Sequence, residues 1–242
     1  MKNRLKLLIK RVVYTGSKRY CAVCDRGCNR FLQFGVVTRN DARCPFCGSL
    51  ERHRFVVRFL RERTDLFDQT DKDFLHVAPE AGLEPIFSRA AGNGYLTADL
   101  MKKGVMEKMD ITDIHHGNDS FDVIYCSHVL EHVPEDRKAM SEFYRTLRPS
   151  GWAVLNVPIT EEHTFEDPSV TDPEERLRLF GQVDHVRRYG RDYKDRLESA
   201  GFHVTIYTPS DLLSDSELVR QGMSNGEAGE IYYCTKATQS AS

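Results

Sequence analysis

The chain has 242 residues, enough for one domain of ordinary size and a smaller module. Hydrophobic residues make up 40% of it, which excludes wholesale disorder, and no apolar run approaches the roughly 20 residues of a membrane helix. The net charge of -2 conceals two different parts: residues 1–63 hold 16 basic and 4 acidic side chains, and residues 64–242 hold 18 and 32. We therefore expect two domains, 1–63 and 64–242. The basic one either meets an anionic partner or docks on the acidic one.

The N-terminal segment 1–11 predicts a short basic amphipathic helix. Its apolar run before Lys10 is only three residues, whereas a secretory signal needs about 7–15. We therefore expect a soluble, cytoplasmic protein without a membrane partner.

Four cysteines form two C-x2-C pairs, Cys21 with Cys24 and Cys44 with Cys47, and 19 residues lie between the pairs. This spacing is typical of a structural site in which two tight turns present four thiolates to one metal ion. Zn²⁺ is the expected metal, with iron as the alternative, and Gly48 suits the positive φ of such a turn. A closed four-thiolate site holds a small fold together and catalyses nothing.

Cys28 is a fifth cysteine close to these pairs, and it either fills the core or replaces one ligand. Disulfides are not expected, because a protein without a secretory signal stays in a reducing compartment. Residues 31–37 predict short strands of a zinc ribbon, and residues 49–63 predict an arginine-rich helix. That helix either reads an anion or is a solvated linker.

From Asp73 onward, strands and helices alternate. Strands are predicted at 74–78, 94–99, 121–126 and 151–157, and helices at 83–91 and 135–147. This order predicts an α/β fold in which helices cover both faces of a mostly parallel sheet, with ligands at the carboxyl ends of its strands.

Three features follow these strands. Asp99 and Asp110 have the placement of carboxylates that bind a nucleotide, although an exposed turn explains an aspartate equally well. His128-Val-Leu-Glu-His132 matches the H-x-x-E-H motif of inverted zinc proteases, but Pro134 ends the segment before a long helix can form. We therefore expect a loop or a single turn there and no protease.

The segments 120–133, 147–157 and 197–204 resemble class I S-adenosylmethionine-dependent methyltransferases, and the resemblance covers roughly residues 73–236. The cysteine pairs, followed by His76-Val-Ala-Pro-Glu80, resemble a bacterial subgroup of these enzymes that carries an N-terminal zinc ribbon. The resemblance implies a Rossmann-like seven-stranded sheet whose last strand, 230–235, is antiparallel. It also implies S-adenosylmethionine as cofactor, with Asp99 on the ribose and with Asp110 and Ile111 beside the adenine. The full set of residues implied to bind the cofactor is His76, Ala78, Glu80, Gly82, Asp99, Leu100, Asp110, Ile111, Ser127 and His128.

The sequence departs from this family in its first loop, where only Gly82 remains of three glycines. Ala78 costs little there, Pro79 removes a hydrogen-bond donor, and Glu80 adds a charge. One interpretation is that Glu80 binds the cofactor's ammonium group. The other is that cofactor binding is degenerate and the domain is a non-catalytic scaffold. The intact Asp99, Asp110 and loop 127–133 favour retained binding.

The segment 158–190 is rich in Glu, Asp and Pro and predicts an insertion or lid over the acceptor site. If the acceptor is a hydroxyl, a base must take its proton, and histidine suits this near neutral pH. The candidate catalytic residues are His185, Tyr189 and His128, with Arg187 as an alternative to Tyr189 for positioning the acceptor. Asp184 and His185 alternatively only orient the next helix.

The sequence thus favours a methyltransferase that acts on a small molecule or metabolite, with the zinc ribbon capping or shaping the acceptor site. The alternatives are an RNA methyltransferase whose basic ribbon grips phosphates, and an enzyme that uses the sulfonium for other chemistry.

Overall fold

The computed structural model of the protein describes residues 12–35 and 38–236, so the helix predicted at 1–11 lies outside the described residues. Contacts divide the chain into two compact units. The first comprises residues 1–70, 80–90 and 208–230, and the second comprises residues 71–79, 91–207 and 231–242. The domain boundary at residue 63 stays a prediction, because this division groups segments that are distant in sequence.

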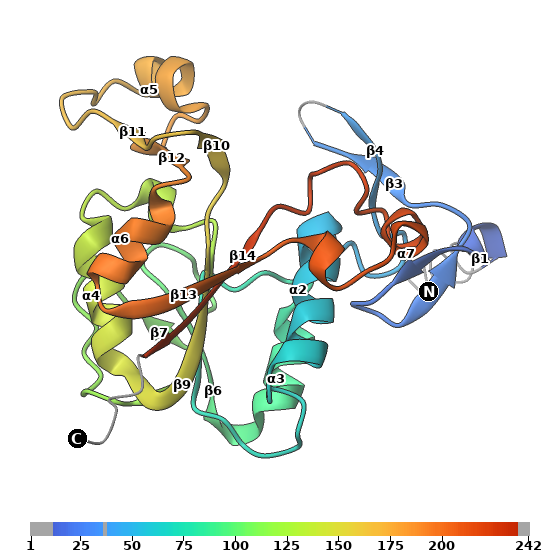
Figure 1. Cartoon of the computed structure of the whole chain (residues 1–242), viewed down its shortest axis with the longest axis horizontal. Coiled ribbons are helices and arrows are strands. Elements are labelled where there is room, and N and C mark those ends of the chain that lie inside the picture. Colours follow the sequence, from blue (N-terminus) through green and yellow to red (C-terminus); the bar gives the residue numbers. More distant parts are fainter. Residues whose placement is uncertain (1–11, 36–37, 237–242) are drawn as a thin grey trace. The chain divides into compact units, whose positions relative to one another are not determined.

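The second unit is built on a seven-stranded sheet in the order β13-β14-β9-β8-β5-β6-β7 (Figure 1). Only β14 runs antiparallel to its neighbours, as the antiparallel pairs β13–β14 and β14–β9 show. This sheet confirms the predicted Rossmann-like α/β class. Its strands are β5 (Phe74–Val77), β6 (Tyr95–Asp99), β7 (Glu107–Lys108), β8 (Phe121–Ser127), β9 (Leu147–Asn156), β13 (Phe202–Tyr207) and β14 (Ile231–Lys236).

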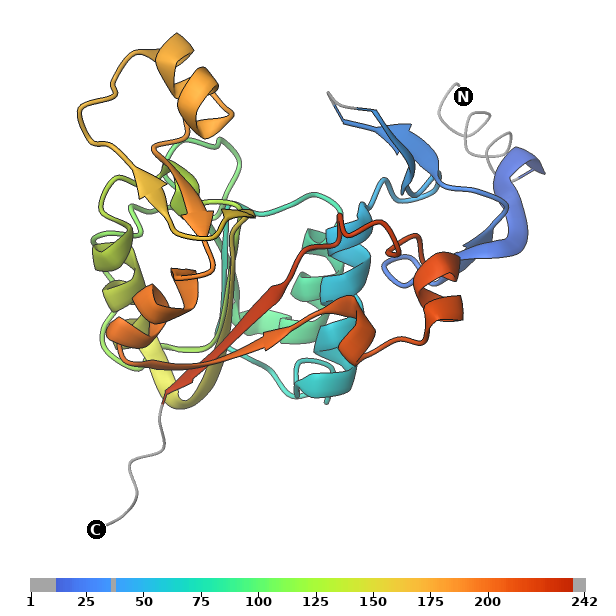
Figure 2. The same cartoon turned by 45° about the horizontal axis from the view of Figure 1, so that its top comes forward.

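The central strands form because they are short apolar runs that are buried on both faces. All four residues of β5 are buried, and β8 is buried at every position except Asp122. Helices α4 (Asp136–Thr146) and α6 (Tyr193–Ser199) pack against each other and against β9 and β13 respectively (Figure 2). The core between them includes Met140, Phe143 and Leu197. Two 3₁₀ turns complete this part, η1 (Gly92–Gly94) and η2 (Leu130–His132).

An insertion between β9 and α6 forms a small sheet of its own in the order β10-β12-β11 (Figure 1). Its elements are β10 (Ile159–Glu161), β11 (Phe165–Glu166), α5 (Pro173–Phe180) and β12 (Arg187–Gly190). Helix α5 has clear ends: the Asp172 carboxylate accepts the Glu175 N–H, Pro173 occupies the first turn, and Gly181 at φ 89° closes the helix. The insertion thus runs from β10 to β12, and its role as a lid over the acceptor site stays a prediction.

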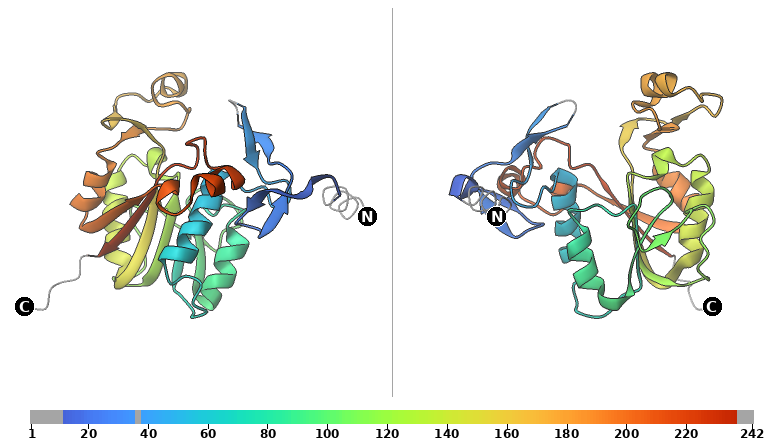
Figure 3. Two further views of the ribbon diagram at one scale, coloured as in Figure 1. Left: turned by 45° about the vertical axis from the view of Figure 1, so that its right-hand side comes forward. Right: turned by 180° about the vertical axis from the view of Figure 1, so that it is seen from behind.

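The first unit contains two β-hairpins, shown in blue in Figure 3. One pairs β1 (Thr15–Cys21) with β2 (Arg26–Cys28), and the other pairs β3 (Leu32–Phe34) with β4 (Arg39–Arg43). The unit also holds α2 (Glu51–Arg63), most of α3 (Glu84–Ala91), η3 (Pro209–Asp211) and α7 (Asp215–Arg220). Within the described ranges, no helix is both long and apolar enough to cross a bilayer.

One arginine of helix α2 fits neither interpretation of this helix. Arg61 and Arg63 are exposed, but Arg54 is fully buried, so it neither faces water nor is open to an anion. The Arg54 guanidinium donates to the carbonyls of Ala42 and Ser49 on one side and of Gln221 and Gly222 on the other, and it stacks 4.0 Å from the Phe31 ring centroid. Arg54 therefore ties the hairpin region to residues 208–230 within the first unit. A charge run in a sequence does not distinguish a solvated arginine from one whose donors all meet carbonyls.

Candidate active site and cysteine cluster

A pocket of about 610 Å³ lies in the second unit, beyond the carboxyl ends of β5, β6, β7 and β8. This edge is the switch point of the sheet, because β5 pairs with β6 on one side and with β8 on the other. The volume falls within the range of about 300–1,000 Å³ that is usual for small-molecule sites. The lining residues are Val77, Ala78, Asp99, Leu100, Met101, Met109, Asp110, Ile111, Thr112, His128, Val129, His132, Val133, Pro134, Glu135 and Asp184.

Two lining residues have a left-handed backbone although neither is glycine. Ala78 has φ 48° directly after β5, and His128 has φ 56° directly after β8. A left-handed alanine costs about 1–2 kcal/mol, so the strain at Ala78 is larger than the sequence suggested. Such strain is commonly kept where it shapes a binding site.

The two predicted aspartates line this pocket and are shaped by local hydrogen bonds. Oδ1 of Asp99 accepts the N–H groups of Met101 and Lys102, each at 2.7 Å. Oδ1 of Asp110 accepts from the backbone and the hydroxyl of Thr112, which lowers the pKa of Asp110. Both side chains therefore have fixed orientations. Ile111 is buried beside them, and Leu100 is 47% exposed.

Two other residues that were predicted to bind the cofactor do not line the pocket. His76 is fully buried in the sheet, where its Nδ1 lies 2.7 Å from the Tyr95 hydroxyl and its ring meets Tyr125 edge-on. Ser127, the last residue of β8, is 6% exposed.

Glu80 and Gly82 belong to the first unit. Oε1 of Glu80 lies 2.7 Å from Nε2 of His53 and 2.9 Å from a guanidinium nitrogen of Arg52, and Gly82 lies beside His53. Burial opposes ionisation of Glu80, but the hydrogen bond from His53 and the charge of Arg52 outweigh it and lower the pKa of Glu80 to about 2. No local sequence pattern signals this pairing, because Glu80 lies 27 positions from His53.

The candidate catalytic residues fall into different surroundings. His128 lines the pocket. His185 is 7% exposed and does not line it; its Nδ1 lies 3.2 Å from the Phe180 carbonyl, and burial lowers the pKa of the imidazole. Tyr189 is fully buried, and its hydroxyl donates to Asp136 at 2.7 Å. Burial also raises the pKa of Tyr189, so this hydroxyl keeps its proton at neutral pH and is unsuited to act as a base.

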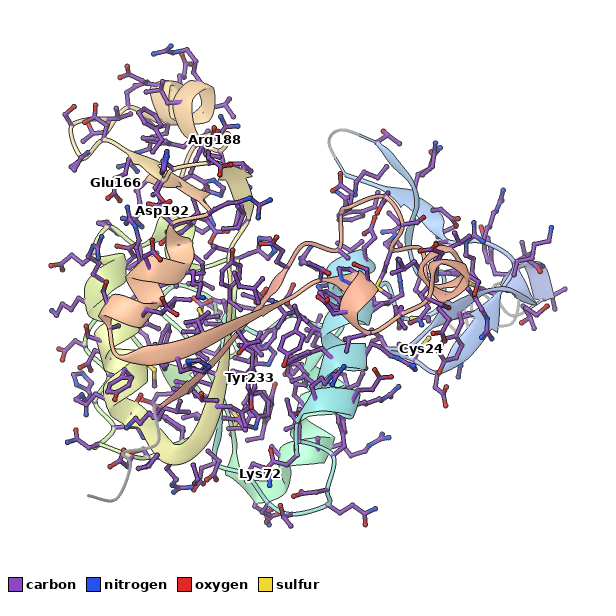
Figure 4. The ribbon with its side chains drawn as sticks, in the orientation of Figure 1. Cys24, Lys72, Glu166, Arg188, Asp192 and Tyr233 are labelled. Atoms are coloured by element: carbon purple, nitrogen blue, oxygen red, sulfur yellow. The ribbon has the colours of Figure 1, made fainter. Side chains whose placement is uncertain are left out.

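Sequence reasoning missed the ion-pair network that fixes the insertion. Arg187, offered as an alternative for positioning the acceptor, is 3% exposed and donates to the carbonyls of Leu130, Val133 and Pro134. Glu166 accepts from Arg187 and from Arg196, and both effects outweigh its desolvation and lower the pKa of Glu166 to about 2. Figure 4 labels Glu166 and, nearby, Arg188 and Asp192. The network explains why β12 stays against the loop that carries His132.

In the first unit, the ligand atoms of Cys21, Cys24, Cys44 and Cys47 all lie within 4.8 Å of one another. The Sγ atoms of Cys21 and Cys47 are 3.6 Å apart, and those of Cys24 and Cys44 are 3.8 Å apart. Sulfurs around a tetrahedral ion with bonds of about 2.3 Å lie about 3.8 Å apart, so this donor set fits such an ion. Gly48 has φ 77°, which confirms the prediction made for it.

Cys28 lies outside this cluster of described residues and is fully buried. No disulfide joins any two of the seven cysteines, all of which lie in the described ranges. The Ser49 hydroxyl lies 3.1 Å from the sulfurs of both Cys21 and Cys47, which is the place of an outer-shell hydrogen bond to a metal thiolate.

Comparison with known proteins agrees with this fold. Residues 89–155 match a family model described as a methyltransferase domain. No curated protein matches the chain. The matched segment runs from α3 to β9, so residues 89–155 are similar to a methyltransferase domain and lie within the Rossmann-like part of the fold.

Several solved structures resemble the chain at low identity. A S-adenosylmethionine-dependent methyltransferase from Archaeoglobus fulgidus is 16% identical, with a TM-score of 0.47 over 78% of this chain and 95% of that one. One from Mesorhizobium loti is 17% identical, with a TM-score of 0.46 over 68% of this chain and 90% of that one. The 1,6-didemethyltoxoflavin-N1-methyltransferase of Burkholderia thailandensis is 11% identical, with a TM-score of 0.47 over 77% of this chain and 78% of that one.

Proposed function

We propose that the protein transfers the methyl group of S-adenosylmethionine to a small-molecule acceptor. The observation that carries this proposal is the pocket at the switch point of the sheet. It is lined by six of the ten residues that the resemblance implies, namely Ala78, Asp99, Leu100, Asp110, Ile111 and His128. In this proposal Asp99 accepts hydrogen bonds from the ribose hydroxyls, and Asp110 and Ile111 flank the adenine.

The reaction is a displacement at carbon. A lone pair of the acceptor forms a bond to the methyl carbon as the carbon–sulfur bond breaks, and sulfur leaves with its electron pair as S-adenosylhomocysteine. The acceptor's proton passes to a base. We assign that role to His128, because among His128, His185 and Tyr189 only His128 lines the pocket.

The four-cysteine cluster is proposed to hold a structural Zn²⁺. Four thiolates around one ion form a closed site, so the metal stabilises the hairpins of the first unit and takes no part in methyl transfer. That the ribbon caps the acceptor site stays a prediction.

RNA is the alternative acceptor, favoured by the excess of basic residues over 1–63. Contacts within the first unit argue for the small molecule instead. Arg39 pairs with Glu51, Arg52 pairs with Glu80, and Arg54 is buried against carbonyls. These guanidinium groups already have partners and are poorly placed to grip phosphates.

Calorimetric titration with S-adenosylmethionine and S-adenosylhomocysteine tests cofactor binding. We expect the wild type to bind both, and Asp99→Asn to weaken binding at least about tenfold, because a neutral amide is a poorer acceptor than a carboxylate. Asp113→Asn, an exposed aspartate that does not line the pocket, is the matched control and should bind normally. A wild type that binds neither compound would refute the proposal.

Methyl-labelled S-adenosylmethionine and a fractionated cell extract test the acceptor. We expect label in the low-molecular-weight fraction, and His128→Gln should transfer no label even at a concentration of S-adenosylmethionine that saturates it. Label in the RNA fraction would establish the alternative acceptor. Consumption of the cofactor without transfer of label would establish other sulfonium chemistry.

A further inference from the structure

A second cluster of ligand-type side chains lies at the wall of the pocket. One ligand atom each from Glu131, His132 and His185 lies within 4.8 Å of the others. Glu131 and His132 belong to η2, and His185 comes from the end of the insertion just before β12. His132 lines the pocket, so this cluster borders the site described above.

Two atoms of this cluster are buried without a hydrogen-bond partner in the described part of the chain. They are Oε2 of Glu131 and Nε2 of His185. Glu131 is 2% exposed and His185 is 7% exposed, so water does not readily reach either one. A buried carboxylate oxygen and a buried imidazole nitrogen without partners cost free energy unless a cation or a proton lies between them.

The other nitrogen of each imidazole has a partner that suits a metal ligand. Nδ1 of His185 lies 3.2 Å from the Phe180 carbonyl oxygen, and Nδ1 of His132 lies 3.3 Å from the Asp184 carboxylate. Metal-binding histidines almost always donate their second N–H to a carbonyl or carboxylate, which fixes the ring and directs Nε2 at the ion. The two rings lie edge to face with centroids 4.6 Å apart.

We propose that Glu131, His132 and His185 bind a divalent transition-metal ion beside the cofactor pocket. Two imidazoles and one carboxylate are a usual ligand set for Zn²⁺, Fe²⁺ and Mn²⁺, and three protein ligands leave coordination positions for another molecule. Tetrahedral ligands at about 2.0–2.1 Å lie about 3.4 Å apart, so the side chains close by small rotations when the ion binds.

The H-x-x-E-H segment thus takes a different role from the protease motif. In that motif both histidines face the metal from one helix. Here η2 is a single 3₁₀ turn, and Nδ1 of His128 lies 3.5 Å from Glu131 on the pocket side. The second histidine ligand comes instead from His185, 53 positions further along the chain.

The metal would hold an acceptor that carries an anionic or hydroxyl oxygen, because such oxygens complete the coordination of these ions. This part of the inference rests on the proposed methyl transfer. The metal site itself does not depend on the proposed methyl transfer. Metal binding is measured without cofactor, and cofactor binding is measured without added metal.

Titration with Mn²⁺ followed by electron paramagnetic resonance tests the site, because Mn²⁺ prefers oxygen and nitrogen ligands to the thiolates of the cysteine cluster. We expect the wild type to bind one Mn²⁺ per chain. Loss of a residue that only orients a metal ligand typically lowers metal affinity by roughly 10–100-fold, and we expect a loss of Mn²⁺ affinity in that range for Asp184→Asn. We expect Glu131→Gln and His185→Gln, which remove ligands, to lose more Mn²⁺ affinity than this. His203→Gln, an exposed histidine on β13, is the matched control and should bind as the wild type does.

Thermal unfolding gives a readout that separates a metal ligand from a merely structural residue. Without added metal, Glu131→Gln should be at least as stable as the wild type, because it removes the charge of a buried carboxylate whose Oε2 lacks a hydrogen-bond partner among the described residues. At about a hundredfold excess of Mn²⁺ over Kd, the Tm of the wild type should rise by about 5–10 °C and that of Glu131→Gln should not. If Glu131→Gln does not fold, the same comparison with His185→Gln decides.

The proposal is overturned if the wild type binds no Mn²⁺, or if both variants bind it as tightly as the wild type. Failure of the wild type to bind S-adenosylmethionine would refute the proposed reaction and leave this result unchanged.

Discussion

Glu80 is a single side chain whose ionisation stabilises the fold. Its folded-state pKa of about 2 lies below the unfolded value of about 4.5, so its contribution is complete above pH 4.5 and is lost as the pH falls towards 2. We expect Glu80→Gln to lower the free energy of unfolding by about 2–3 kcal/mol at pH 7. The gap to the wild type should narrow by about 1.4 kcal/mol by pH 3.5.

Urea unfolding of both proteins at several pH values measures this gap, and any release of metal in acid is common to the two. Glu84→Gln is the matched control, because Glu84 lies in the same segment and is exposed. A gap that is constant from pH 7 to pH 3 would mean that Glu80 is not held ionised by Arg52 and His53.

Some residues of the candidate site were predictable from the sequence and others were not. Asp99, Asp110 and Ile111 were placed at the pocket because their motif reports a local spacing after a strand. Ala78 and His128 adopt left-handed backbones that only a glycine would have signalled. Glu131 and His185 become neighbours through the path of the insertion, which no local pattern in the sequence records.

The insertion between β9 and α6 depends on Arg187 of β12. This guanidinium is buried and meets three backbone carbonyls of the loop 130–134 together with Glu166. We expect Arg187→Met to cost about 3–5 kcal/mol of unfolding free energy, because it leaves buried acceptors without their donor. The variant should also bind S-adenosylmethionine more weakly, since Val133 and Pro134 of that loop line the pocket.

Arg188→Met is the matched control for this experiment. Arg188 is the next residue of β12, and its side chain is 41% exposed and pairs with Glu161. An exposed pair contributes about 0–1 kcal/mol, so this variant should unfold nearly as the wild type does. Equal losses for the two variants in urea unfolding would show that burial of Arg187 does not matter.

The elements themselves were largely predictable. Short apolar runs located β5, β6, β8 and β9 to within a few residues, because a strand buried on both faces must be apolar throughout. The small sheet β10-β12-β11 was not predicted as a sheet, since its strands are two to four residues long and carry charge. Its order depends on tertiary ion pairs instead of on local pattern.

At the scale of the whole chain, the net charge of the first compact unit is smaller than the net charge of the basic N-terminal segment alone. Residues 1–63 have a net charge of +12. The segments 64–70, 80–90 and 208–230, which complete the first unit, add 9 acidic and 2 basic residues and lower its net charge to +5. Much of the basic charge is therefore compensated inside one compact unit, which weakens the argument for a phosphate-binding surface.

The contacts within the first unit predict that its separate segments unfold together. In the proposed zinc site the four clustered cysteines hold the hairpin region together, and Arg54 connects that region to Gln221 and Gly222. We expect Cys44→Ser to abolish zinc binding. It should also lower hydrogen-exchange protection at least about tenfold, both in residues 15–43 and in residues 208–230. The protection of β8 and β9 in the second unit should not change. Arg54→Met should lower hydrogen-exchange protection in the same two segments, although this variant should still bind zinc.

Zinc content and hydrogen exchange measured by mass spectrometry check this expectation. Cys28→Ser is the matched control, because Cys28 is buried in the same unit but lies outside the cluster, and it should keep its zinc. If Cys44→Ser loses protection only in residues 15–43, then residues 208–230 fold independently of the metal. The three segments of the first unit would in that case be neighbours in space without forming one cooperative unit.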